Sequence, residues 1–83
     1  MKEQYEDFAI IHNTPKGQLL ITKELGDDED EYIITLWIDI VIGTVKLALK
    51  IKDEEIANKA FEAFRDYELA KAAINTALNQ EYL

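Results

Sequence analysis

The side chains that carry out most covalent catalysis are nearly missing from this chain of 83 residues. It contains no cysteine and no serine, and its only histidine is His12. A hydroxyl nucleophile with a histidine base would have to combine a threonine with His12, which is a rare arrangement. A zinc site needs more nitrogen and sulfur ligands than the chain provides. The composition therefore predicts a protein that is not an enzyme and holds no metal or cofactor.

The most charged stretch is a run of carboxylates formed by Asp27, Asp28, Glu29, Asp30 and Glu31. It lacks the alternating ligand spacing and the central glycine of a calcium-binding EF-hand loop. One interpretation is a solvated hairpin loop whose charges discourage pairing between sheet edges. The other is a partner-binding patch, because a basic partner gains attraction and a faster association rate from it. We predict that these residues face a cationic surface, such as the nucleic-acid-binding groove of a partner protein.

Composition limits the remaining classes of function. The formal net charge of −8 opposes direct nucleic-acid binding, which depends on neutralising phosphates. No run of about 18 apolar residues is present, so we expect no membrane span. The acidic, polar residues 1–7 do not form a signal peptide, and with the absence of cysteine they predict a cytoplasmic protein. With 48% hydrophobic residues, the chain is expected to build a single domain over residues 1–83.

Residues 32–52 read as a hairpin that turns around Ile42-Gly43, either in a two-residue turn or in a four-residue loop over Val41–Thr44 that keeps the same register. The apolar residues occupy even positions before this point and odd positions after it, so a hairpin places both sets on one face. The opposite charges of Asp39 and Lys46 support the same register. The predicted cross-strand pairs are Ile40–Val45, Ile38–Leu47, Leu36–Leu49, Ile34–Ile51, Asp39–Lys46 and Trp37–Ala48.

This register places Trp37 on the face opposite the aliphatic residues, with Lys46 and Lys50 nearby. A tryptophan beside a small residue and surrounded by charges has the composition of an interface hot spot. The alternative is that another part of the chain covers Trp37. We name Trp37 as a partner-binding residue and leave both alternatives open.

The rest of the sheet and the helical region follow from turn and capping signals. We expect strands at 5–13 and 18–25, joined by a turn at 14–17 in which Pro15 presets φ, without a fixed register. Asp53 is a good N-cap and is followed by two glutamates in the first helical turn. Helical periodicity then continues to Leu78. The region 53–82 is either one long helix or a helix broken near Asp66, which would cap the second part.

The alanine-rich tail offers a further candidate surface. Four alanines surround Ile74 and Leu78, and small residues allow helices to approach closely. The two interpretations are packing within the chain and self-association through Ile74 and Leu78, which would make the protein a homodimer or larger.

The predicted fold is α+β: a four-stranded antiparallel meander over residues 5–52, followed by one long or broken C-terminal helix packed on one face. The predicted function is a small acidic protein-binding module that inhibits or modulates a larger, nucleic-acid-binding protein. The alternative is a homo-oligomeric structural or assembly protein. In its general character (tiny, acidic, free of cysteine and without catalytic groups) the chain resembles small phage-encoded proteins that bind and block host enzymes.

Overall fold

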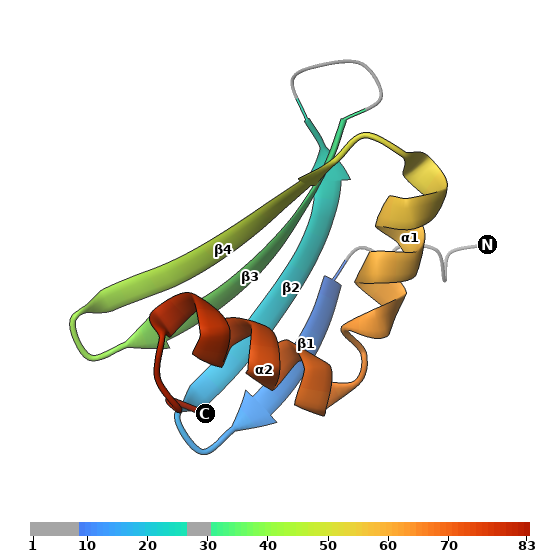
Figure 1. Cartoon of the computed structure of the whole chain (residues 1–83). Coiled ribbons are helices and arrows are strands. Elements are labelled where there is room, and N and C mark those ends of the chain that lie inside the picture. The colour runs from blue at the N-terminus through green and yellow to red at the C-terminus, as the bar shows by residue number, and fades with distance from the viewer. Residues whose placement is uncertain (1–8, 27–30) are drawn as a thin grey trace.

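The computed structural model describes residues 9–26 and 31–83 and shows an antiparallel sheet followed by two helices (Figure 1). The strands lie side by side in chain order, which confirms the predicted α+β meander. The elements are β1 (Ala9–Thr14), β2 (Gly17–Leu25), β3 (Tyr32–Ile40), β4 (Gly43–Ile51), α1 (Glu54–Ala63) and α2 (Tyr67–Leu78). The four carboxylates at 27–30 and residues 5–8 of the predicted first strand lie outside the described residues.

The β1–β2 and β3–β4 hairpins each turn through two residues and place a glycine directly after them. In the first, Pro15 and Lys16 form the turn and Thr14 pairs with Gly17, which fixes the register that the sequence left open. The Thr14 hydroxyl accepts a hydrogen bond from the Lys16 amide at 3.0 Å and donates one to the Gly17 carbonyl at 2.6 Å. Gly17 has φ +123°, a conformation that favours a residue without Cβ.

The predicted register of the β3–β4 hairpin is wrong by two residues. The pairs are Ile40–Gly43, Asp39–Thr44, Ile38–Val45, Trp37–Lys46, Leu36–Leu47, Thr35–Ala48 and Ile34–Leu49. The turn consists of Val41 and Ile42. It leaves the unusual φ of +151° to Gly43, which has no Cβ, and spares Ile42 a positive φ. A shift of two residues keeps every side chain on its predicted face, and Trp37 still lies opposite the aliphatic row.

The two helices cover one face of the sheet and bury most of its apolar residues (Figure 1). The buried residues of this core are Ile10, Leu19, Ile21, Ile34, Leu36 and Ile38 of the sheet, and Phe61, Phe64, Ala70 and Ile74 of the helical region. The side chains on the opposite face of these strands are polar or only partly buried, as expected for a sheet with one packed face.

The helical region is broken, which is one of the two predicted alternatives. Asp53 caps α1 and accepts a hydrogen bond from the Ile56 amide at 3.1 Å. Asp66 caps α2 and accepts one from the Glu68 amide at 3.0 Å. Asp66 stabilises the free amides of a new helix start, so the chain can change direction there and fold α2 back onto the sheet.

Candidate functional site

The face of the sheet opposite the helices carries Trp37 near its middle. Alternation along the strands brings Ile11, Leu20, Trp37 and Ala48 to this open face, which neither α1 nor α2 covers. Ile11 and Ala48 are exposed, while Leu20 and Trp37 are half-buried. The open face therefore presents apolar side chains to solvent instead of a purely polar surface.

Two neighbours fix the indole ring of Trp37. Its Nε1–H donates a hydrogen bond to Thr22 Oγ1 at 3.0 Å. The ammonium nitrogen of Lys46, which lies opposite Trp37 on β4, sits 4.6 Å from the ring centroid. Such a cation–π contact contributes about 0.5–1 kcal/mol at an exposed site. Because Trp37 is held from both sides, little side-chain freedom is left to lose when a partner binds.

A shallow hollow of about 530 Å³ lies beside Trp37. Its lining residues are Gln18, Leu20, Trp37, Ile38, Asp39, Thr44 and Lys46. The Thr44 hydroxyl donates a hydrogen bond to Asp39 Oδ1 at 2.6 Å, which orients the carboxylate at the rim. The hollow combines an indole, an aliphatic side chain, a cation and a carboxylate, and these groups are suited to binding rather than to a proton-transfer step.

The acidic run is described only at its last residue. Glu31 is 8% exposed, and its backbone carbonyl accepts a hydrogen bond from the Gly26 amide at 2.7 Å. Its side chain lies against Gly26, since a Cβ added at Gly26 would lie 2.6 Å from Glu31 Oε1. Glu31 therefore folds inward at the base of the loop, and the role of Asp27, Asp28, Glu29 and Asp30 in partner binding stays a prediction.

The residues named for self-association face the interior of their own chain. Ile74 is 0% exposed and belongs to the core, and Leu78 packs against that core. This is the intramolecular alternative that the sequence left open. Because Ile74 and Leu78 face the core, another side of α2 faces solvent. That side begins with Leu69, which is 43% exposed.

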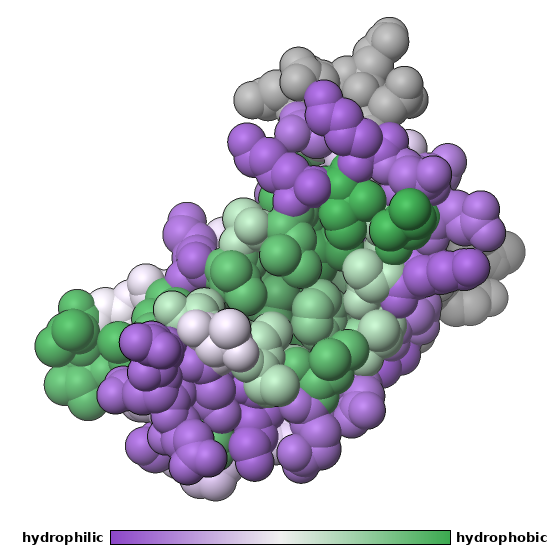
Figure 2. Space-filling view, viewed as in Figure 1, coloured by the Kyte–Doolittle hydropathy of each residue, from purple (hydrophilic) through white to green (hydrophobic). Residues whose placement is uncertain are grey.

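An apolar hollow of about 500 Å³ lies between the outward side of α2, α1 and β4. Figure 2 shows apolar surface gathered in this space, and a second apolar area at the β3–β4 turn on the left. The lining residues are Leu47, Ala60, Ala63, Phe64, Leu69, Ala72, Ala73, Thr76 and Ala77. The sequence pattern did not predict this hollow, although Leu69, Ala73 and Thr76 recur at helical spacing beside the stripe of Ile74 and Leu78.

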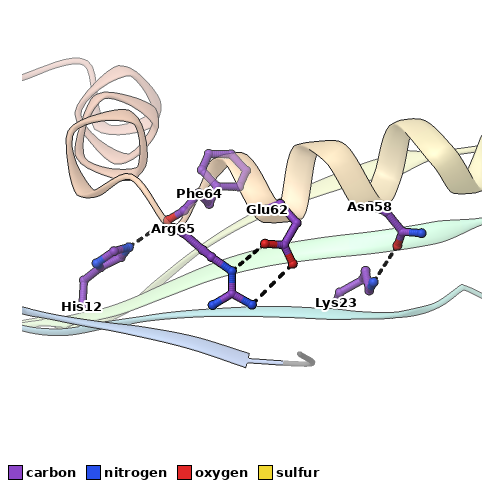
Figure 3. Close-up of polar contacts among 6 residues, drawn as sticks. All are labelled: His12, Lys23, Asn58, Glu62, Phe64 and Arg65. Atoms are coloured by element: carbon purple, nitrogen blue, oxygen red, sulfur yellow. Dashed lines mark hydrogen bonds and ion pairs between the residues drawn. The ribbon is translucent and has the colours of Figure 1, made fainter. Parts of the chain in front are cut away.

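Polar contacts fasten the helices to β1 and β2 (Figure 3). His12 Nε2 lies 2.8 Å from the carbonyl oxygen of Phe64, where α1 ends, and must carry the proton because a carbonyl only accepts. Lys23 Nζ donates to Asn58 Oδ1 at 2.6 Å. The only histidine is therefore half-buried in a structural contact.

The exposed pair Glu62–Arg65 belongs to α1 and the turn after it. Arg65 Nε donates to Glu62 Oε1 at 2.6 Å, and this hydrogen bond holds the pKa of Glu62 below its usual value (Figure 3). No group of three or more potential metal ligands occurs within residues 9–26 and 31–83. In that same part of the chain, neither helix has the length and apolar character needed to cross a membrane.

Comparison with known proteins assigns the chain to no family. No family model, no curated protein and no solved structure matches the chain.

Proposed function

We propose that this protein is a non-enzymatic binding module that docks a larger protein on the open face of its sheet, with Trp37 at the centre of the contact. The observation that carries the proposal is an indole held by Thr22 and Lys46 on a face that neither helix covers. Tryptophan is enriched among the residues that dominate binding energy, particularly where a neighbouring hollow can be filled and desolvated.

The charge distribution supports a partner with a cationic surface. On the open face, Lys46 and Lys50 balance Glu24 and Asp39, so the contact around Trp37 carries little net charge. The chain as a whole has a net charge of −8, and β2 leads from Glu24 directly into the acidic run. A basic partner would be attracted to this end and would then dock on the nearly neutral face.

This arrangement suits an inhibitor or modulator of a nucleic-acid-binding protein. Carboxylates of the acidic run would occupy positions where phosphates bind, while the open face supplies apolar contact. Affinity would then come from the surroundings of Trp37, and association rate from the carboxylates.

Site-specific photo-crosslinking tests where the partner docks. A crosslinking residue at Gln18, which is exposed and lines the hollow, should capture the cationic partner. The same residue at Lys59, which is exposed on α1, is the matched control. Capture from position 18 should be strong and should fall at least tenfold in a Trp37→Ala background, because a hot-spot truncation costs about 2 kcal/mol or more.

Circular dichroism of each variant checks that the fold is retained. Trp37→Phe separates the two parts of the contact, since it keeps a ring and loses the N–H that bonds Thr22. Equal capture from positions 18 and 59, or unchanged capture by a folded Trp37→Ala variant, would contradict docking on the open face.

The acidic run has its own test with the captured partner. Replacement of Asp27, Asp28, Glu29 and Asp30 by Asn and Gln should slow association while leaving dissociation nearly unchanged. The loss should shrink at high salt, because such charges are screened beyond about 8 Å at physiological ionic strength. Unchanged association at low salt would leave Trp37 as the site and remove the run from the proposal.

An assembly role is the second candidate function. It does not rest on Ile74 and Leu78, which pack into the core. It rests on the edge of β4, the last strand in the described part of the chain, and on the apolar surface beside it.

A further inference from the structure

The helix-covered face is incomplete at β4. The inward-facing residues of this strand, Val45, Leu47, Leu49 and Ile51, are all half-buried, whereas those of β3 that pair with them include the fully buried Leu36 and Ile34. Leu47 also lines the apolar hollow between the helices. A folded chain that leaves a contiguous apolar surface of this kind gains free energy when a second surface covers it.

The edge of β4 is regular enough to accept another strand. Within residues 9–26 and 31–83, β4 is the last strand of the sheet, and its pairing with β3 runs through all nine residues without a bulge. It contains no proline, and its two charged residues, Lys46 and Lys50, both lie on the open face, so no charge interrupts the inward apolar row. A long edge without proline, bulge or inward-pointing charge is a template for strand addition.

We propose that a second copy of this chain pairs antiparallel with β4 about a two-fold axis at Leu47. The two sheets would merge into one eight-stranded sheet, and the half-buried rows of both β4 strands would lie at its centre. The helices of both copies would then flank a shared apolar space over the two β4 strands. Both open faces with Trp37 would stay accessible, so this dimer is independent of the partner proposed above.

Charge selects this register, and in it β4 is complementary to a second copy of itself, because each lysine faces an uncharged residue. With the axis at Leu47, Lys46 lies opposite Ala48 of the second copy, and Lys50 lies opposite its Thr44. Moving the axis to Ala48 would set Lys46 against Lys50, and moving it to Lys46 would set that lysine against itself. Like charges directly opposite each other destabilise a strand pair. The favoured register is also the one that pairs all nine residues of Gly43–Ile51.

The same register places the exposed turn residues at the two ends of the interface. Gly43 would lie opposite Ile51 of the second copy, so Val41 and Ile42 would lie just beyond the end of its β4. Val41 is 100% exposed and Ile42 is 89% exposed. Both contribute little to the monomer core and would be partly covered beside the second copy.

A matched pair of substitutions at Ala48 tests both the dimer and its register. Ala48 is exposed and pairs with Thr35 in its own chain, so either charge is tolerated in the monomer. Ala48→Glu places a carboxylate opposite Lys46 of the second copy, and Ala48→Lys places a second cation there. By symmetry each contact occurs twice, so sedimentation equilibrium should show a dimer dissociation constant about two- to thirty-fold lower for A48E and similarly higher for A48K.

Other outcomes overturn the proposal. If both substitutions weaken the dimer, Ala48 faces itself and the axis is misplaced. If neither has an effect, Ala48 is not opposite Lys46. If the unaltered protein sediments as a monomer up to millimolar concentration, no dimer forms through β4.

A single introduced cysteine gives an independent test, because the chain contains none of its own. Residues opposite each other in an antiparallel pair have Cα atoms about 4.5–5.5 Å apart, which falls within the range for a disulfide. Leu47→Cys should therefore form a covalent dimer on mild oxidation, whereas Lys59→Cys, exposed on α1, should not. Equal crosslinking of the two variants, or none for a folded L47C variant, would contradict an axis at Leu47.

Discussion

The helices bury the two sides of the sheet face that they cover, β1 and β2 on one side and β4 on the other, to different degrees. Over β1 and β2, the helices bury Leu19 and Ile21 completely. Over β4, an equally apolar row that includes Leu47 and Leu49 stays half-buried. Apolar character alone therefore does not decide where the helices settle, because both sides offer it.

Specific polar contacts distinguish the two sides. His12 reaches the Phe64 carbonyl from β1, and Lys23 of β2 bonds Asn58 and lies 5.2 Å from the Phe61 ring centroid. Lys16, in the turn between these strands, lies 4.4 Å from the ring centroid of Tyr82. These contacts join the helical region to β1, β2 and the turn between them, so directional interactions help to position the helices over that side of the sheet.

The largest expected difference between the two sides appears when the same side chain is truncated on each. Leu19→Ala removes a fully buried leucine and should lower the free energy of unfolding by about 2–5 kcal/mol. Leu47→Ala removes a half-buried leucine. It should lower the free energy of unfolding by roughly half as much or less, because part of the Leu47 side chain is already in water. Urea denaturation at low micromolar concentration measures both. Equal losses would show that the helices seal the two sides alike.

A smaller effect is expected from the contact between β1 and the end of α1. His12→Leu keeps much of the side-chain volume but removes the donor to the Phe64 carbonyl, so the free energy of unfolding should fall by about 0.5–1.5 kcal/mol. His12→Gln retains a donor and should recover part of this loss. If both variants are as stable as the original, this hydrogen bond does not hold the helices over β1.

The smallest effect is expected at the exposed pair Glu62–Arg65, which does not distinguish the two sides. Glu62 has a lowered pKa in the folded protein, so the pair stabilises the fold at neutral pH. That contribution is lost as the pH falls through the folded pKa. Glu62→Gln should cost less than about 0.5 kcal/mol at pH 7, since exposed pairs contribute little. The stability difference between Glu62→Gln and the unaltered protein should vanish in acid. A difference that persists in acid would point to packing as its source.

The sequence predicted what depends on alternation and capping. The even and odd rows around the β3–β4 turn assigned the residues of both strands to the right face, and Asp53 and Asp66 marked both helix starts. The register of the β3–β4 hairpin could not be fixed in this way, because a shift by two residues preserves the faces. The φ of Gly43 decided it, and this conformation is a property of the folded turn.

The candidate site was predictable only in part. Trp37 was assigned to the open face from alternation, but its contact with Lys46 depends on the corrected register. The apolar hollow depends on the direction in which α2 folds back after Asp66, and the local sequence does not predict that direction. Glu31 was grouped with its acidic neighbours by composition, whereas its position against Gly26 follows from closure of the loop.

Amide hydrogen exchange along β4 tests most directly whether this strand is the free side of the sheet and the place where a second copy binds. Pairing alternates along an antiparallel ladder from the turn, so the amides of Thr44, Lys46, Ala48 and Lys50 point away from β3. In dilute protein these amides should exchange rapidly, and they should become protected as the concentration rises through the dimer dissociation constant. Exchange at these four amides that is independent of concentration would contradict the account.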